Sequence, residues 1–162
     1  MGYYNPILSY GLERFAVDAR DAGVDGIIVP DLPFEEAGSL QTKCNQHEIH
    51  LIPLLAPTST DHRIAQSCEK ATGFVYCVSL TGVTGARAEL PAGIPALTQR
   101  VRRHTDLPLA IGFGISQRRH VDTLAPWAQA AVVGSALIEV VGKTPYGQRE
   151  EAIRDFVAEL KG

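Results

Sequence analysis

The sequence of 162 residues contains no apolar run that approaches the roughly 18 residues of a membrane-spanning helix. Its first residues also lack the charged and apolar regions of a secretory signal peptide. These two absences predict a cytoplasmic protein that does not enter a membrane. The net charge is only -3 and the basic residues are scattered, so the composition argues against a nucleic-acid-binding face.

The sequence has few residues of the kinds that cross-link a protein or bind a metal. The three cysteines, Cys44, Cys68 and Cys77, follow no CxxC spacing and cannot all pair, which favours a reducing compartment and a packing role. The five histidines form no HxxxH pattern, so we expect no metal site. With 45% hydrophobic and 20% charged residues, residues 1–162 are expected to fold as a single domain.

Apolar segments of strand character alternate along the chain with amphipathic segments of helical period. Because these strand segments are apolar throughout, they predict a parallel α/β sheet that is covered by helices. We expect strands near Gly26–Asp31, His50–Ala56, Gly73–Leu80, Leu107–Phe113 and Gln129–Gly134, after a strand end at Met1–Asn5. We expect helices near Tyr10–Ala22, Glu35–His47, Asp61–Ala71, Ile94–His104, Gln117–Leu124 and Gln148–Leu160, with a short turn at Ala136–Val141.

The last two predicted strands both end in small residues. Gly112 and Gly114 follow one strand, and Gly134 and Ser135 follow the other. Glycine lets backbone amides approach a ligand closely, and a helix that begins beside those amides adds the positive end of its dipole. Each glycine turn alone is also ordinary turn chemistry. Their pairing predicts a phosphate site, because eight-stranded parallel barrels commonly bind phosphate after their last two strands.

Six short segments carry a resemblance to a known family. They are Tyr3–Pro6, Ile28–Pro33, Ala56–Thr60, Ser79 with Thr81–Gly85, Gly112–Ser116 and Val133–Ala136. In order and spacing they resemble the tryptophan synthase alpha chain over essentially the whole sequence. The resemblance implies a TIM (β/α)8 barrel that cleaves indole-3-glycerol phosphate to indole and glyceraldehyde 3-phosphate in tryptophan biosynthesis. It implies no cofactor in this chain, since pyridoxal phosphate belongs to the beta chain that receives the indole in an α2β2 assembly.

The resemblance also implies roles for individual residues. Phosphate-binding backbone falls at Gly85, Gly114, Gly134 and Ser135. Substrate-binding positions fall at Tyr3, Ile28, Leu55, Tyr76, Thr84, Gly112 and Phe113. The first four of these are expected to line the indole pocket, and Thr84 lies in a segment that resembles the family's mobile loop. Without the resemblance, Leu55 and Tyr76 are explained more simply as filling of the barrel interior.

The sequence departs from the family in length. A (β/α)8 barrel needs about 250 residues, whereas the sequence has five complete predicted strands, which correspond to the C-terminal part of an incomplete barrel. The family's catalytic glutamate and aspartate are not in the sequence, so we expect the chain alone to be inactive. Met1 resembles a methionine inside the family's third strand, which predicts a fragment or a truncated form. An unclosed sheet has two free edges and predicts self-association.

Asp31 is the only carboxylate at the carboxyl end of a predicted strand, so considered without the family it would be the general base. The resemblance instead places this position in the region that faces the beta chain, where its structural role would be to cap the following turn. Two alternatives to the lyase stay open. One is a non-catalytic module that binds phosphate or the beta chain, and the other is a different phosphate-binding barrel enzyme that uses Asp31.

Overall fold

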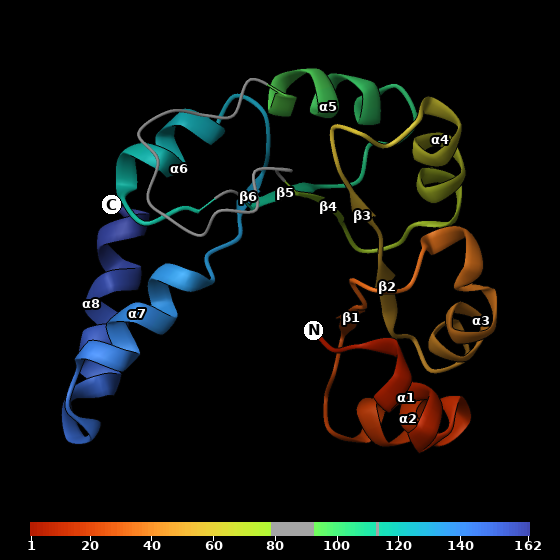
Figure 1. Ribbon diagram of the computed structural model, residues 1–162, viewed down its shortest axis with the longest axis horizontal. Coiled ribbons are helices and arrows are strands. Elements are labelled where there is room, and N and C mark those ends of the chain that lie inside the picture. Colours follow the sequence, from red (N-terminus) through yellow and green to blue (C-terminus); the bar gives the residue numbers. More distant parts are fainter. Residues whose placement is uncertain (79–92, 113) are drawn as a thin grey trace.

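The computed structural model describes residues 1–78, 93–112 and 114–162. Its parallel strands follow one another in chain order: β1 (Gly26–Ile28), β2 (His50–Ile52), β3 (Leu54–Leu55), β4 (Val75–Val78), β5 (Leu109–Gly112) and β6 (Ala130–Ala131). β1 pairs with β2, and β3 to β6 pair in sequence order. In Figure 1 the strands form an arc with most helices on its outer side, and the two ends of the arc stay apart.

Pro53 separates β2 from β3 within one extended segment. Proline has no backbone N–H to donate to a neighbouring strand, but its carbonyl oxygen accepts a hydrogen bond from the amide of Tyr76 at 3.0 Å. The segment therefore pairs with β1 through its first half and with β4 through its second half. The observed strands correspond to the five predicted ones, and each is shorter in the described residues than predicted.

Six predicted helices are also present. They are α2 (Leu12–Asp21), α3 (Gly38–Gln46), α4 (Asp61–Lys70), α5 (Gly93–Arg102), α6 (Arg118–Leu124) and α8 (Arg149–Lys161), and short 3-10 turns lie at η1 (Phe34–Glu36) and η2 (Tyr146–Gln148). At the start of α4, the Thr60 side chain accepts a hydrogen bond from the amide of Arg63 at 3.2 Å. This cap explains why the helix begins where the polar segment after β3 ends.

The prediction of a strand end at Met1–Asn5 is wrong, because helix α1 (Tyr4–Tyr10) begins within it. Pro6 is tolerated there since the amides of the first helical turn have no partner in the helix. Only Gly2 keeps a strand-like contact, in which its amide donates to the carbonyl oxygen of Ile28 at 3.1 Å. Gly11, with φ of 94°, ends α1 and separates it from α2, so the helix predicted from Tyr10 begins at Leu12.

The short turn predicted at Ala136–Val141 is instead part of helix α7 (Ser135–Lys143). Its sequence contains no proline and no glycine until Gly142, so nothing stops the helix after one turn. The helix ends at Lys143, and the next residue, Thr144, precedes Pro145 and has an extended backbone, as residues before proline prefer. This longer helix matters for function because its first turn lies at one end of β6.

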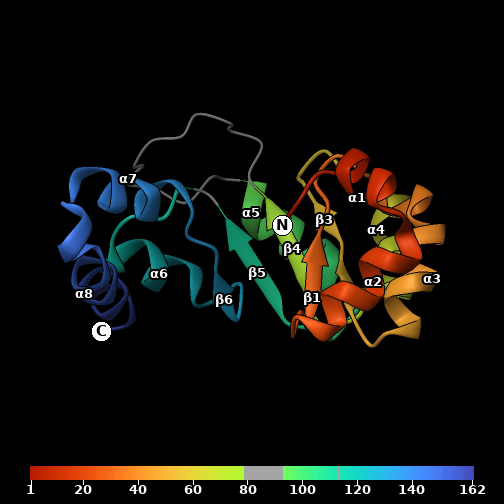
Figure 2. The same cartoon turned by 90° about the horizontal axis from the view of Figure 1, so that it is seen from below.

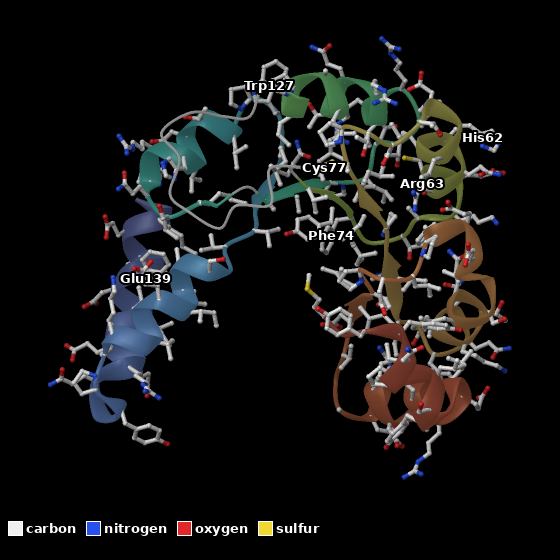
Figure 3. All side chains as sticks on the ribbon, in the orientation of Figure 1. His62, Arg63, Phe74, Cys77, Trp127 and Glu139 are labelled. Carbon is white, nitrogen blue, oxygen red and sulfur yellow. The ribbon has the colours of Figure 1, made fainter. Side chains whose placement is uncertain are left out.

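The side chains of the strands alternate between two faces of the sheet. The outer face carries Leu55, Cys77 and Ile111, which are fully buried in a core that they share with residues of α4 and α5. Figure 3 shows Cys77 on the side of α5 and Phe74, just before β4, on the opposite side of the sheet. That opposite side is called the inner face below, and in a closed barrel it would be the interior.

All three cysteines are buried, as the predicted packing role requires. Burial raises the pKa of Cys44 to about 11 and that of Cys77 to about 12, so both thiols are poor nucleophiles near neutral pH. In the part of the chain that the structure describes, no helix has the length and apolar character to cross a membrane.

Candidate functional site

The two glycine turns lie at the same edge of the sheet. In the parallel register of β5 and β6, Ala110 is opposite Ala130 and Ile111 is opposite Ala131. The amide of Val132 continues this register by donating to the carbonyl oxygen of Ile111 at 2.8 Å. Gly114 and Gly134 thus each follow the carboxyl end of one strand of this parallel pair. Figure 2 shows the arrows of β1 and β5 pointing toward this edge, where α7 also lies.

Gly134 directly precedes α7 and faces open space. A Cβ atom added to Gly134 would meet no atom within 4 Å, and the helix begins at the next residue, Ser135. The amides of this first helical turn have no acceptor in the helix, and the helix dipole adds positive potential there. Gly114, in the neighbouring turn, has φ of 75°, a left-handed conformation that glycine adopts without strain. The geometry therefore suits an anion bound by backbone amides.

Tyr76 and Gly112 lie against one another on the inner face. A Cβ atom on Gly112 would lie 3.0 Å from Cε2 and 3.1 Å from Cζ of Tyr76, and closer still to the phenol oxygen. The tyrosine ring therefore occupies the space that a side chain at position 112 would fill. Burial raises the pKa of the Tyr76 phenol, so the half-buried group is neutral at physiological pH. It offers a ligand an aromatic face and one hydroxyl group.

The predicted role of Leu55 in the indole pocket is not supported by its position. Leu55 pairs in register with Cys77, has no exposed surface and belongs to the core between the sheet and the helices. Its neighbour Leu54 pairs with Tyr76 and is partly exposed, so Leu54 lies on the inner face instead. Ile28 shares this face, because the alternate residue Ile27 is packed into the outer core. Alternation of side chains along the strand is the physical reason for the correction.

The remaining predicted substrate positions are less enclosed or are not described. Tyr3 lies just before α1 and is 68% exposed, so the described residues do not bury it in a pocket. Thr84, Gly85 and Phe113 lie outside the described residues. Among the predicted positions, Gly114, Gly134 and Ser135 follow the carboxyl ends of β5 and β6, and Ile28, Tyr76 and Gly112 lie on the inner face.

Asp31 has a structural partner that the sequence did not reveal. Its two carboxylate oxygens accept hydrogen bonds from the amide of Tyr4, at 2.9 and 3.1 Å. Tyr4 is the first residue of α1, so Asp31 caps that helix and not the turn that follows β1. The expectation that Asp31 caps the following turn is thus wrong. A carboxylate committed to a helix amide is also a weaker candidate for a general base.

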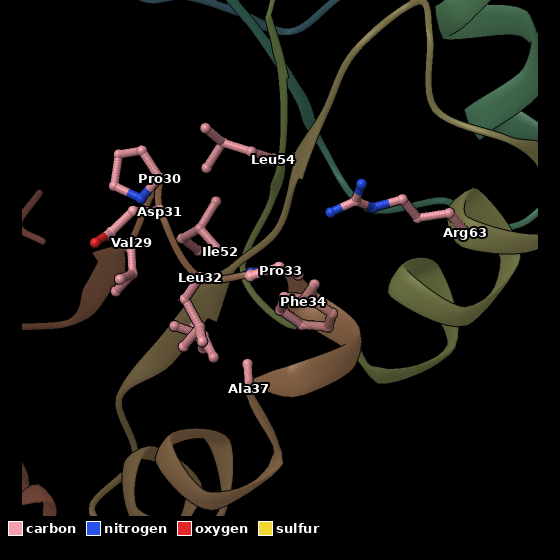
Figure 4. Close-up of a pocket in the computed structure, with 11 residues that line it drawn as sticks. Val29, Pro30, Asp31, Leu32, Pro33, Phe34, Ala37, Ile52, Leu54 and Arg63 are labelled. Carbon is pink, nitrogen blue, oxygen red and sulfur yellow. The ribbon is translucent and has the colours of Figure 1, made fainter. Parts of the chain in front are cut away.

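A small cavity of about 120 Å³ lies next to Asp31 (Figure 4). It is lined by Val29–Phe34 and by residues from neighbouring elements, among them Leu54 and Arg63. The guanidinium of Arg63 lies 3.3 Å from the carboxylate of Glu35. Arg63 was not predicted as a site residue, although its place in the first turn of a helix that follows a strand's carboxyl end was a usable signal. Among the described residues, no group of three or more His, Cys, Asp or Glu side chains is arranged to hold a metal ion.

The protein-family model of the tryptophan synthase alpha chain matches residues 1–161. The alpha chain of Roseiflexus sp. (strain RS-1) is 53% identical over 162 residues, which cover 100% of this chain and 62% of the relative. The alpha chain of Chloroflexus aggregans is 49% identical over 160 residues, which cover 99% of this chain and 60% of the relative. The chain thus spans about three fifths of the length of these relatives.

Two solved structures show the same likeness in three dimensions. A chain of the tryptophan synthase α2β2 complex of Pyrococcus furiosus is 39% identical with a TM-score of 0.88, over 99% of this chain and 64% of that one. A chain of Mycobacterium tuberculosis tryptophan synthase is 37% identical with a TM-score of 0.88, over 98% of this chain and 58% of that one. The predicted incomplete TIM barrel is confirmed. The chain belongs to the tryptophan synthase alpha chain family.

Proposed function

We propose that this chain binds indole-3-glycerol phosphate as the phosphate-binding and indole-binding part of a tryptophan synthase alpha chain. The observation that supports this most strongly is that glycine turns follow both strands of the parallel pair β5 and β6, and that α7 begins directly after the second turn, in a member of this family. The phosphate dianion is held mainly by amides at Gly114, Gly134 and Ser135. The indole ring lies on the inner face, against Ile28, Tyr76 and Gly112.

The reaction proposed for the complete site is a retro-aldol cleavage, which releases indole and glyceraldehyde 3-phosphate. It requires a base that takes a proton from the glycerol hydroxyl and an acid that delivers a proton to the indole ring carbon. A positioned carboxylate contributes roughly 100- to 10,000-fold in either role. Asp31 is held by Tyr4, so we propose that the carboxylates come from the part of the family barrel that this chain does not span. On this account the chain alone binds substrate without turning it over.

We further propose that residues 1–162 act as one cytoplasmic domain that needs no cofactor and associates with a tryptophan synthase beta chain. The support is that structural relatives at 37% to 39% identity are tryptophan synthases, one of them an α2β2 complex. The resemblance places the position of Asp31 toward the beta chain, and we propose that the cavity lined by Asp31 and Arg63 belongs to the same contact region. Pyridoxal phosphate would belong to that partner.

The second candidate is a non-catalytic module that binds phosphate or the beta chain. The Asp31–Tyr4 hydrogen bonds favour it over a barrel enzyme that uses Asp31 as its base. The discriminating experiment adds the purified chain to a tryptophan synthase beta chain and follows both tryptophan formation from added indole and indole release. Stimulation of the beta reaction without indole release, also after the chain is extended at its N-terminus by the corresponding segment of a family member, supports the module. Indole release by the chain, lost in Asp31→Asn with folding retained, would support the Asp31 enzyme.

A further inference from the structure

His120 lies beside the turn that follows β5, although no sequence pattern connects it with a ligand. It is in the first turn of α6 and only 2% exposed. Its Nδ1 atom lies 3.2 Å from the backbone nitrogen of Ser116. A backbone N–H can only donate, so Nδ1 accepts this hydrogen bond and the ring proton is on Nε2. Burial and the neighbouring Arg119 both lower the pKa of His120, which favours this neutral form.

The turn Gly114–Ser116, called the phosphate turn below, is held at two places. The Ile115 side chain is 2% exposed and packs in the core between the sheet and the helices, where it joins Leu124 of α6. The Ser116 amide is bound by His120. Because this amide already has an acceptor, it is not free to bind an anion. A phosphate group would therefore be bound by the backbone at the Gly114 end of this turn.

We propose that His120 is a positioning residue, in which Nδ1 holds the Ser116 amide and so fixes the backbone that Gly114 presents to the phosphate group. This inference rests on the phosphate site proposed above. The arrangement is similar to a capping box, in which the third residue of a helix accepts a hydrogen bond from an amide just before the helix. Histidine is not the usual residue there, but glutamine is, so glutamine supplies a matched replacement for the accepting atom.

The test measures two quantities on the 162-residue chain: hydrogen exchange at the Ser116 amide and the calorimetric Kd for glycerol 3-phosphate. His120→Leu removes the acceptor and keeps much of the volume. We expect faster exchange at Ser116 and a Kd about tenfold weaker, the usual effect of one lost hydrogen bond. His120→Gln should restore both quantities to within about twofold of the original chain. The amide of Ile64, in the core-facing part of α4, reports global opening.

Three results would overturn the proposal. One is an unchanged Kd in His120→Leu while exchange at Ser116 accelerates, because the bond would then be structural only. Another is a His120→Gln chain that binds as weakly as His120→Leu. The third is an unmodified chain that does not bind glycerol 3-phosphate, which would refute the phosphate site itself and is thereby distinguished from the first two. If His120→Leu does not fold, His120→Phe carries the same test, since phenylalanine keeps a planar ring but has no atom that accepts a hydrogen bond from the Ser116 amide.

Discussion

The carboxylate of Asp31 accepts hydrogen bonds from the amide of Tyr4, which lies 27 positions earlier in the chain. The pair links the segment after β1 to the first turn of α1. Asp31→Ala should therefore lower the free energy of unfolding by about 1 kcal/mol, the usual cost of losing a charged group at a helix N-terminus. Urea denaturation measures this loss. Asp31→Asn should lose less, because the amide oxygen still accepts, and a larger loss in Asp31→Asn would contradict the assignment.

Because Gly112 and Tyr76 are in contact, the cost in stability of a substitution at Gly112 should depend on the residue at position 76. Gly112→Ala should destabilise the chain by about 1 to 3 kcal/mol, because the new methyl group meets the tyrosine ring. In a Tyr76→Ala background the same substitution should cost much less, so a double-mutant cycle shows a coupling between the two positions. Gly142→Ala is the matched control, since its Cβ meets no atom within 4 Å. Equal costs in both backgrounds would mean that the ring does not occupy this space.

A substitution at Gly134 should change ligand binding without unfolding the chain. Gly134→Asp should abolish the binding of glycerol 3-phosphate, because the new carboxylate takes the place of the anion. The chain should stay folded, since the site is open and aspartate is a favourable residue before a helix. Calorimetry measures the binding and circular dichroism the folding. Gly134→Ala is the control and should retain most of the affinity. An unchanged Kd in Gly134→Asp would remove the phosphate assignment.

Alanine substitutions of the neighbours Leu54 and Leu55 should have opposite effects on stability and on indole binding. Leu55→Ala should lower the free energy of unfolding by about 2 to 5 kcal/mol, because the side chain is fully buried in the outer core. Leu55→Ala should change the Kd for an indole ligand only slightly, after correction for the fraction of the variant that is folded. Leu54→Ala should cost less stability and should weaken the binding of an indole-containing phosphate analogue. Fluorescence titration and urea denaturation of both variants provide the comparison, and the reverse pattern would place Leu55 on the inner face.

The order of the elements and the two glycine turns were predictable from the sequence. Apolar strand segments and amphipathic helices give a strong periodic signal, and Gly114 and Gly134 stand directly after such strands. The face on which Leu55 lies was not predictable, because both faces of a covered parallel strand are apolar. The partner of Asp31 depends on tertiary structure that brings Tyr4 beside it, and no local pattern encodes such a contact.

Helix α1 and the role of His120 were missed for related reasons. Met1–Asn5 is predicted as a strand end, and Asn5 and Pro6 are residue types common in turns, so the sequence predicts no helix before Tyr10. The spacing of His120 to the other histidines argues only against a metal site and says nothing about a hydrogen bond to a backbone amide. Histidine is not the usual residue of a capping box, so the sequence at the start of α6 carries no known pattern for this hydrogen bond.

The most direct test of the account measures indole release from indole-3-glycerol phosphate by the 162-residue chain. The same chain, extended at its N-terminus by the corresponding segment of a family member, is the positive control. The account predicts turnover only in the extended protein, together with substrate binding in the short chain. Indole release by the 162-residue chain itself would contradict it, and would mean that a residue of this chain, with Asp31 as the first candidate, supplies the base.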